Sequence, residues 1–304
     1  MPLLNFLLLC LIWGSTWIAI KIGLQDFPPI LSAGARFVVA ALFLFGLVKL
    51  KSIPSPNSWS ELKPAAVFGA LNGVGYGFIY WGEQHITSSM TAILNSSLPF
   101  FSTFFAYWLL HERLNARKVG ALVLGFTGVI IVFGSSPEGG SAIAFYGQGA
   151  IILASAIYSL GSVILKKANT HTKLNTQIDP LLAVTIQMAM SAVVLLAAGI
   201  PLEYDHRVTF SLSGIISFLY LAIFGSAIAF LIYYHLLQKW EVTRVSYVSL
   251  VTPLIASVIG VLWYQEAFNT RLLLGFILVL GGLVLVNLPG HRTAATGNGS
   301  GLKN

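Results

Sequence analysis

The sequence predicts an all-α membrane protein with ten transmembrane helices arranged as two inverted five-helix repeats. Of the 304 residues, 56% are hydrophobic and only 9% are charged, whereas a soluble domain carries roughly 25% charged residues. Apolar stretches of about 20 residues, the length needed to cross a bilayer, recur along the chain. The stretch from Pro99 to Val132 also returns without a gap from Pro253 to Val286, which divides the chain into two related halves.

Ten apolar stretches are the predicted membrane spans. They are Leu3–Leu24, Pro29–Leu50, Pro64–Glu83, Ser88–Leu110, Lys118–Gly134, Ala144–Leu165, Pro180–Ile200, Leu212–Leu236, Thr243–Tyr264 and Leu272–Leu288. The first five form a repeat at residues 1–136, and the second five form a repeat at residues 144–288. The remaining residues, 289–304, are rich in Gly, Ser and Thr and are expected to form a disordered cytoplasmic tail.

The positive charges predict the orientation of these spans. Most of the 17 Lys and Arg residues fall in the tail and in loops on one side of the spans. The positive-inside rule therefore places both termini in the cytoplasm, which agrees with an even number of crossings. Since each half has an odd number of spans, the second half enters from the opposite side, and the repeats are inverted. This topology explains the net charge of +7 without nucleic acid as a partner.

Motifs for the common membrane chemistries are missing from the sequence. It has no Gly-rich phosphate loop, no metal-ligand spacing among its six His and single Cys, and no supported Ser-His-Asp arrangement. The sequence therefore predicts no enzyme, no cofactor and no metal site. No Asp or Glu lies at mid-depth in any span, so proton-coupled export of lipophilic cations is disfavoured, and a zwitterionic or neutral metabolite fits better.

The first span carries a stripe of Trp13, Trp17 and Lys21 on one helix face. This stripe is either part of a ligand pocket that ends in a cation or an interfacial aromatic belt with a snorkelling lysine. We favour the pocket for Trp13 because it lies near mid-depth. The stripe returns in the second half, where Tyr158 and Lys166 correspond to Trp13 and Lys21.

The third span has a stripe of Asn72, Tyr76 and Tyr80 at helical spacing. An amide that faces lipid without a partner costs free energy, so this face is expected to line a cavity or to make an interhelical hydrogen bond. A second stripe, at Gly69, Gly73 and Gly77, is expected to let a neighbouring helix approach closely.

Equivalent prolines in the fourth and ninth spans, Pro99 and Pro253, are predicted hinges or kinks. A mid-span proline removes a backbone hydrogen bond and frees a carbonyl, which suits either a ligand or a kink capped by a hydroxyl. Asn95 and Ser249, each four residues before its proline, share a helix face with it and are candidate binding residues.

Charged residues within or at the ends of spans need a cavity or a partner. Arg36 is costly in lipid and is expected to face one, whereas its counterpart in the second half is the neutral Gln187. Lys21, Arg36 and Glu83 are candidate charge partners. Weaker candidates for the binding site are three residues of the second half, Tyr158, Ser226 and Tyr247.

The segments WGSTWIAIKIGL, ARFVVAALFLF, LNSSLPFF and HERLNARKVGALVLGFTGVIIV resemble the EamA-like branch of the drug/metabolite transporter superfamily. The resemblance covers residues 3–288 and implies a ten-helix inner-membrane carrier with a central cavity. It points to Trp13, Trp17, Asn72, Tyr76, Tyr80, Asn95, Tyr158, Ser226, Tyr247 and Ser249 as cavity residues. It also implies export of amino acids or related metabolites.

We therefore expect a secondary transporter or facilitator in the cell inner membrane that moves amino acids or similar small metabolites by alternating access. The alternative is a multidrug exporter of lipophilic compounds, which would depend little on the two asparagines. The expected partners are a small-molecule metabolite and the lipid bilayer, with no nucleic acid, and the sequence is compatible with a monomer.

Overall fold

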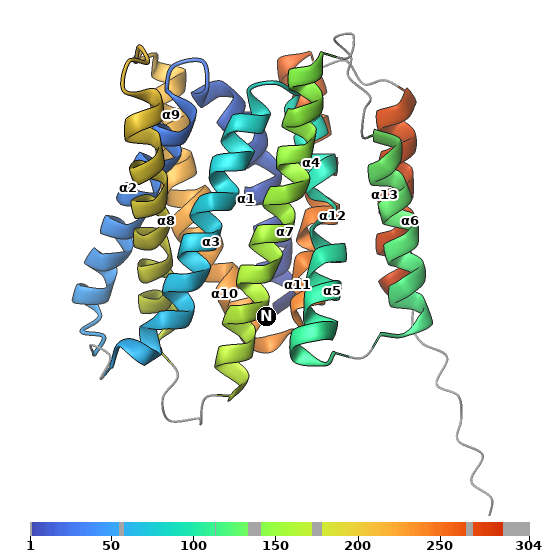
Figure 1. The fold of residues 1–304 in the computed structure, drawn as a ribbon, viewed down its shortest axis with the longest axis horizontal. Coiled ribbons are helices and arrows are strands. Elements are labelled where there is room, and N and C mark those ends of the chain that lie inside the picture. Colours follow the sequence, from blue (N-terminus) through green and yellow to red (C-terminus); the bar gives the residue numbers. More distant parts are fainter. Residues whose placement is uncertain are drawn as a thin grey trace, which may run out of the picture.

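The computed structural model describes residues 2–54, 58–112, 114–132, 141–171, 178–265 and 270–287, and within these ranges the fold is helical with no strand (Figure 1). The elements are α1 (Pro2–Gly23), α2 (Pro29–Leu50), α3 (Trp59–Glu83), α4 (Ser88–Asn95), α5 (Leu98–Leu110), α6 (Ala116–Val132), α7 (Ala142–His171), α8 (Pro180–Glu203), α9 (Leu212–Tyr220), the π-helical segment η2 (Leu221–Ile228), α10 (Ala229–Lys239), α11 (Val242–Ser246), α12 (Val248–Tyr264) and α13 (Thr270–Asn287). The predicted tail, residues 289–304, lies outside the described residues.

Within the described ranges, seven helical stretches are long and apolar enough to cross a membrane. They are Pro2–Gly23, Pro29–Leu50, Ser88–Leu110, Ala142–Ala168, Pro180–Glu203, Leu212–Lys239 and Val242–Trp263. The three other predicted spans, which correspond to α3, α6 and α13, are also helical. Helix α3 is less apolar because its cavity-facing stripe and its glycines replace large aliphatic residues, while the apolar parts of α6 and α13 are shorter.

Helices of the two halves pack against each other as related pairs. Helix α2 packs on α8, and α6 packs on α13, while α3 lies against both α7 and α8. The predicted glycine stripe makes the last contact possible: a Cβ on Gly69 would lie 2.5 Å from the Gln187 carbonyl oxygen, and one on Gly73 would lie 2.9 Å from that of Ser191. Only a residue without a side chain permits this approach.

Helices α3 and α7 run antiparallel. Gly82, near the end of α3, lies against Gly147, near the start of α7, whereas Phe68 lies against Gly161. Helix α1 ends beside the end of α3, because Lys21 contacts the Glu83 carbonyl. Helices α1 and α7 therefore end on opposite sides of the bundle, as the ribbon also shows (Figure 1).

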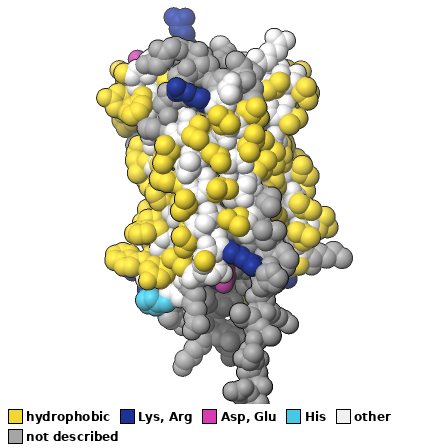
Figure 2. Space-filling model, turned by 90° about the vertical axis from the view of Figure 1, so that its right-hand side faces the viewer, with side chains coloured by type: hydrophobic (Ala, Val, Ile, Leu, Met, Phe, Trp, Pro, Cys, Tyr) yellow, Lys and Arg dark blue, Asp and Glu magenta, His cyan; other side chains and the backbone are white. Residues whose placement is uncertain are grey.

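The face formed by α6 and α13 is apolar across its middle, with Lys and Arg near its two ends (Figure 2). Exposed side chains on it include Val123 and Ile130 of α6 and Leu274 and Ile277 of α13. A band of exposed apolar side chains between charged ends matches a surface that contacts lipid.

Two of the predicted spans are interrupted. The fourth, Ser88–Leu110, breaks near its middle at Ser96–Ser97, so that Pro99 lies in the first turn of α5. The ninth, Thr243–Tyr264, breaks near its start at Tyr247, and Pro253 lies inside the continuous helix α12. The break in the second half is therefore not at the proline but six positions before it.

Candidate functional site

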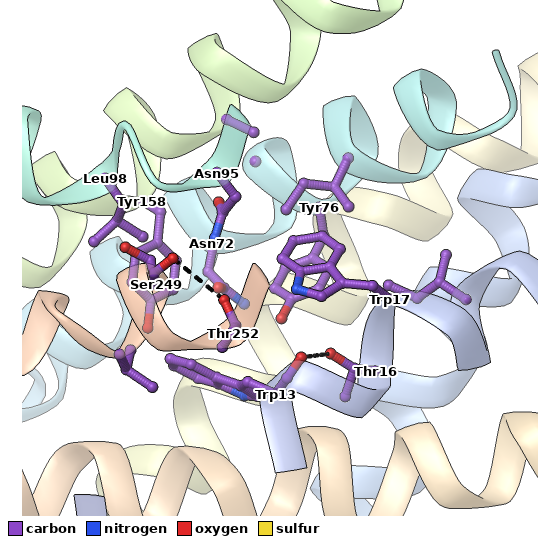
Figure 3. Close-up of a pocket in the computed structure, with 15 residues that line it drawn as sticks. Trp13, Thr16, Trp17, Asn72, Tyr76, Asn95, Leu98, Tyr158, Ser249 and Thr252 are labelled. Carbon is purple, nitrogen blue, oxygen red and sulfur yellow. Dashed lines mark hydrogen bonds between the residues drawn. The ribbon is translucent and has the colours of Figure 1, made fainter. Parts of the chain in front are cut away.

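A central cavity of about 50 Å³ lies between the halves of the chain, with residues from α1, α3, α4, α5, α7 and α12 around it (Figure 3). Its lining contains seven of the predicted binding residues: Trp13, Trp17, Asn72, Tyr76, Asn95, Tyr158 and Ser249. The other three, Tyr80, Ser226 and Tyr247, do not line it. Sequence reasoning missed Thr16, Ile20, Gly75, Ile79, Leu98, Ala154, Val248 and Thr252.

The missed residues have a common explanation. Thr16, Gly75 and Thr252 each follow a predicted residue by three positions on the same helix, so they are its neighbours on the helix surface. The stripes were read at four-residue spacing alone, which outlines only one edge of a helix face. Reading both spacings would have found these three residues.

Aromatic rings form much of the wall. Trp13 lies edge-on to Tyr158 with ring centroids 6.3 Å apart, and its ring is 5.5 Å from Phe230 and 5.3 Å from Tyr233. Phe68 joins the same cluster through Tyr158, at 5.4 Å. Since Phe68 precedes Asn72 on α3, this cluster closes the cavity on the side of the Trp59 end of α3.

Among the buried polar groups at the cavity, the Asn72 Oδ1 acceptor and the Trp17 Nε1 donor have no protein partner in the described part of the chain. The Asn72 side-chain Nδ2 donates to Ser191 Oγ at 2.9 Å, but its Oδ1 accepts nothing. The Trp17 Nε1, on a side chain that is 6% exposed, donates to nothing. A buried acceptor or donor without a partner costs about 1–3 kcal/mol. A bound ligand or water that paired with these atoms would recover that free energy.

Asn95 ends α4 and lies at the cavity beside the helix break. Its Oδ1 accepts a hydrogen bond from Ser155 Oγ at 3.0 Å, which leaves its Nδ2 as a donor. Ser249 and Thr252 lie across the cavity on α12, where Thr252 Oγ1 donates to the Ser249 carbonyl at 3.4 Å (Figure 3). Amide and hydroxyl groups from both halves therefore face one space.

The proline of α12 frees a carbonyl that the other half uses. Pro253 has no N–H to donate to Ser249 O, four residues earlier. Ser96 Oγ, at the break after α4, donates to this oxygen at 2.8 Å. Hydroxyl capping of a freed carbonyl, which was one of two expectations from sequence, is what the structure shows at Pro253.

The π-helical segment η2 lies beside the cavity wall. The Trp13 Nε1 donates to the Gly225 carbonyl of η2 at 3.3 Å, and a Cβ on Gly225 would lie 2.9 Å from Thr16 Cγ2. Ser226 is fully buried in the same segment, and its hydroxyl has no partner among the described residues. Short π-helical segments occur often at functional sites, and nothing in the sequence pattern indicated this one.

Tyr80 leaves the cavity stripe because it pairs with the buried arginine. Arg36 is 1% exposed, and its Nη1 donates to the Tyr80 hydroxyl at 2.8 Å. The guanidinium carbon lies 4.6 Å from the ring centroid of Tyr76 and 4.8 Å from that of Phe37. Arg36 therefore has aromatic neighbours, as cation–π interactions allow, and lies directly behind Tyr76.

Two lysines hold backbone carbonyls at opposite ends of the bundle. The Lys21 Nζ donates to Glu83 O at 2.9 Å and to Ile86 O at 2.8 Å. Its counterpart Lys166 donates to Leu237 O and, at 3.2 Å, to Trp240 O. Each lysine thereby ties the end of its helix to the end of a helix that also borders the core.

Two carboxylic acids lie near Lys166, whereas an imidazole lies near Lys21. Burial raises the pKa of the Glu112 carboxyl above its ordinary value, and the neighbouring Glu241 raises it further. Thr243 Oγ1 donates to Glu112 at 3.2 Å, and Lys118 forms a 2.8 Å salt bridge with Glu241. Beside Glu83, burial lowers the pKa of the His85 imidazole, and the Lys21 charge adds to that effect.

The described residues contain no group of His, Cys, Asp and Glu that could hold a metal ion. The cavity offers amide, hydroxyl and indole groups, which bind an organic solute through hydrogen bonds and ring contacts. It holds no pair of groups suited to acid–base or nucleophilic chemistry.

Comparisons with known proteins identify the family of the chain. The model of the EamA-like transporter family matches residues 1–134 and 145–288. The uncharacterized transporter YoaV of Bacillus subtilis is 25% identical, with 93% of this chain and 95% of YoaV covered. The uncharacterized inner membrane transporter YedA of Escherichia coli is 27% identical, with 92% of this chain and 88% of YedA covered.

A probable amino-acid metabolite efflux pump of Salmonella typhimurium is 26% identical over 97% of both chains. A solved crystal structure superposes with a TM-score of 0.72 at 17% identity, covering 94% of this chain and 96% of the other. That structure shows a shared fold. The family match spans both halves of the chain, so this protein belongs to the EamA-like transporter family and is a multi-pass membrane transporter.

Proposed function

We propose that the protein is a secondary transporter or facilitator that exports amino acids or related small metabolites by alternating access through the central cavity. The proposal includes ten membrane spans in two inverted repeats, at residues 1–136 and 144–288, with both termini in the cytoplasm of an inner membrane. Its main support is the cavity itself, where polar groups and aromatic rings from both halves of the chain surround one space and where Trp17 Nε1 and Asn72 Oδ1 have no partner among the described residues.

The packing of the helices supports inverted repeats. The second helices of the two halves, α2 and α8, pack together, and so do the last helices, α6 and α13. Helix α1 packs on α12 while its counterpart α7 packs on α5. An arrangement in which each contact recurs between counterpart helices is what a pseudo-two-fold axis in the membrane plane produces.

The cavity supports a small polar substrate. Sites for drug-sized ligands enclose roughly 300–1,000 Å³, whereas this cavity measures about 50 Å³. It has an unpaired acceptor at Asn72 Oδ1 and donors at Trp17 Nε1 and Asn95 Nδ2. A solute that carries both donors and acceptors satisfies these atoms better than a lipophilic compound. The relative named as an amino-acid metabolite efflux pump points in the same direction.

Counterflow of labelled amino acids into proteoliposomes tests the proposal. We expect Tyr76→Ala and Asn95→Ala to reduce the exchange rate at least about tenfold, because loss of a hydrogen bond and a ring contact removes roughly 1–3 kcal/mol. Tyr107→Ala, on a lipid-exposed face of α5, is the matched control and should exchange normally. Equal exchange rates in all three variants would contradict the assignment of this cavity as the substrate site. Transport confined to bulky lipophilic compounds would instead favour a multidrug exporter.

A further inference from the structure

We infer that Arg36 makes the central cavity selective for solutes with a negatively charged group, such as a carboxylate, and that it acts through the Tyr76 wall. The inference rests on the proposed function because it deepens the chemistry of the same cavity. Arg36 does not itself line the cavity, so it is a positioning residue for charge and not a direct ligand.

Among the described residues, the charge of Arg36 has no ion-pair partner. No salt bridge joins it to an acidic residue anywhere in the described ranges. Its Nη1 donates to a neutral hydroxyl, that of Tyr80, and its Nε is buried without a partner. Burying a cation that is not paired is expensive. A chain that keeps such a group has a positive potential in its interior.

Two charged residues lie at the end of α3 beyond Tyr80. Glu83 lies one turn beyond Tyr80 on α3 and is fully buried. Lys21 reaches the same helix end, where its Nζ contacts the Glu83 carbonyl oxygen. Two cations and one carboxylate leave this region with a net charge of plus one. The positive field around Arg36 is therefore not cancelled by its neighbourhood.

The path from Arg36 to the cavity is short. The guanidinium carbon is 4.6 Å from the ring centroid of Tyr76, and Tyr76 is itself a lining residue of the cavity. Across roughly 10 Å at an effective dielectric constant of about 20, one unit charge changes the occupancy of another by roughly tenfold. The donors Trp17 Nε1 and Asn95 Nδ2 are available to an anionic group inside.

The equivalent position in the other half carries no charge. The counterpart of Arg36 is Gln187, which is 1% exposed and neutral. A glutamine is therefore accepted at the equivalent position of the fold, which makes Arg36→Gln the natural variant. Of these two counterpart residues only Arg36 is charged, so its contribution to the field is one-sided and orients a solute as well as selecting it.

A cysteine-reactivity experiment on purified full-length protein tests this. Ser249→Cys, in a Cys10→Ala background, places one thiol in the cavity. Its reaction rates are measured with anionic sulfonatoethyl, cationic trimethylammonioethyl and neutral methyl methanethiosulfonates. Each forms a mixed disulfide and releases methanesulfinate. Because thiol ionisation affects all three rates equally, the anion-to-cation rate ratio reports the potential in the cavity.

We expect Arg36→Gln to lower that ratio at least about tenfold and Arg36→Lys to preserve it. The wild-type ratio should also exceed that of a Ser60→Cys control, on an exposed turn of α3. A wild-type ratio no higher than the control overturns the inference even if Arg36→Gln fails to fold. The neutral reagent can label Ser249→Cys normally while the anion-to-cation rate ratio equals that of the control or is unchanged by Arg36→Gln. That result overturns the inference and leaves the proposed function standing. No labelling by the neutral reagent means that the cavity excludes solutes, which overturns the proposed function.

Discussion

Lys21 and Lys166 hold equivalent positions in the two halves, and each donates to two backbone carbonyls at the end of a neighbouring helix. They do so on opposite sides of the bundle, because α1 and α7 end on opposite sides. Both sets of bonds are present together, so the helix ends on both sides of the bundle are held by a lysine in this conformation. In an alternating-access cycle the two ties would open in turn.

The surroundings of the two lysines differ. Glu241 follows Trp240, whose carbonyl accepts from Lys166, and Glu112 accepts from Thr243 two residues further on, whereas His85 lies near Lys21. The same kind of tie is thus accompanied by an acid at one end and by an imidazole at the other. The two related halves therefore share the lysine–carbonyl hydrogen bonds but differ in the titratable groups beside them.

The largest expected effect comes from removing one tie at a time. A charged hydrogen bond contributes about 1.5–3 kcal/mol, so Lys21→Met should open its own end roughly tenfold more often or better, and Lys166→Met the other end. The measurement is labelling of Ser249→Cys by an impermeant reagent applied to one side of oriented vesicles.

The two variants should increase labelling from opposite sides, and Lys49→Met, an exposed lysine at the end of α2, should change neither. Increased labelling from the same side in both variants would contradict the comparison.

The second prediction concerns the close approach of α3 to α8 at Gly69. Gly69→Ala forces a Cβ to within 2.5 Å of the Gln187 carbonyl, and such overpacking costs about 1–3 kcal/mol. Thermal unfolding in detergent should therefore show a lower midpoint. Gly46→Ala is the matched control because its Cβ meets nothing within 4 Å. Equal midpoints for the two variants would mean that α3 and α8 separate without cost.

The smallest expected effects are the responses of stability to pH. The folded state favours protonated Glu112, so its contribution is lost as pH rises above the ordinary value of 4.5. The folded state favours neutral His85, so its contribution is lost as pH falls below 6.5.

In thermal unfolding from pH 4.5 to 8, Glu112→Gln should weaken the loss on the alkaline side, and His85→Gln the loss on the acidic side. Identical pH profiles for both variants and the wild type would show that the two ends do not differ in this way.

Much of the cavity could be predicted from the sequence because helical periodicity reports which residues share a face. The spacing of Asn72 and Tyr76 placed them together, and the cavity contains both. Tyr80 continues the same stripe but turns to Arg36, a contact from another helix that periodicity does not encode. The family resemblance was confirmed by the match over both halves.

The helix interruptions were harder to place. Pro253 lacks an N–H, but one lost bond does not end a helix when Ser96 caps the freed carbonyl, so α12 continues through it. The break lies at Tyr247 instead. The π-helical segment that contains Ser226 was missed for a related reason. Its apolar residues read equally well as an α-helix, and packing against Trp13 and Thr16 distinguishes the two forms.

The bond from Ser96 to the Ser249 carbonyl joins the interrupted helix of one half to the proline-bearing helix of the other. If either helix bends, the other loses a partner in the middle of the membrane, where water is scarce and the loss is costly. The two halves are thus coupled at their centre. In the proposed alternating-access cycle this coupling would make the two helices move together, which would keep both mouths from opening at once and would prevent a continuous leak.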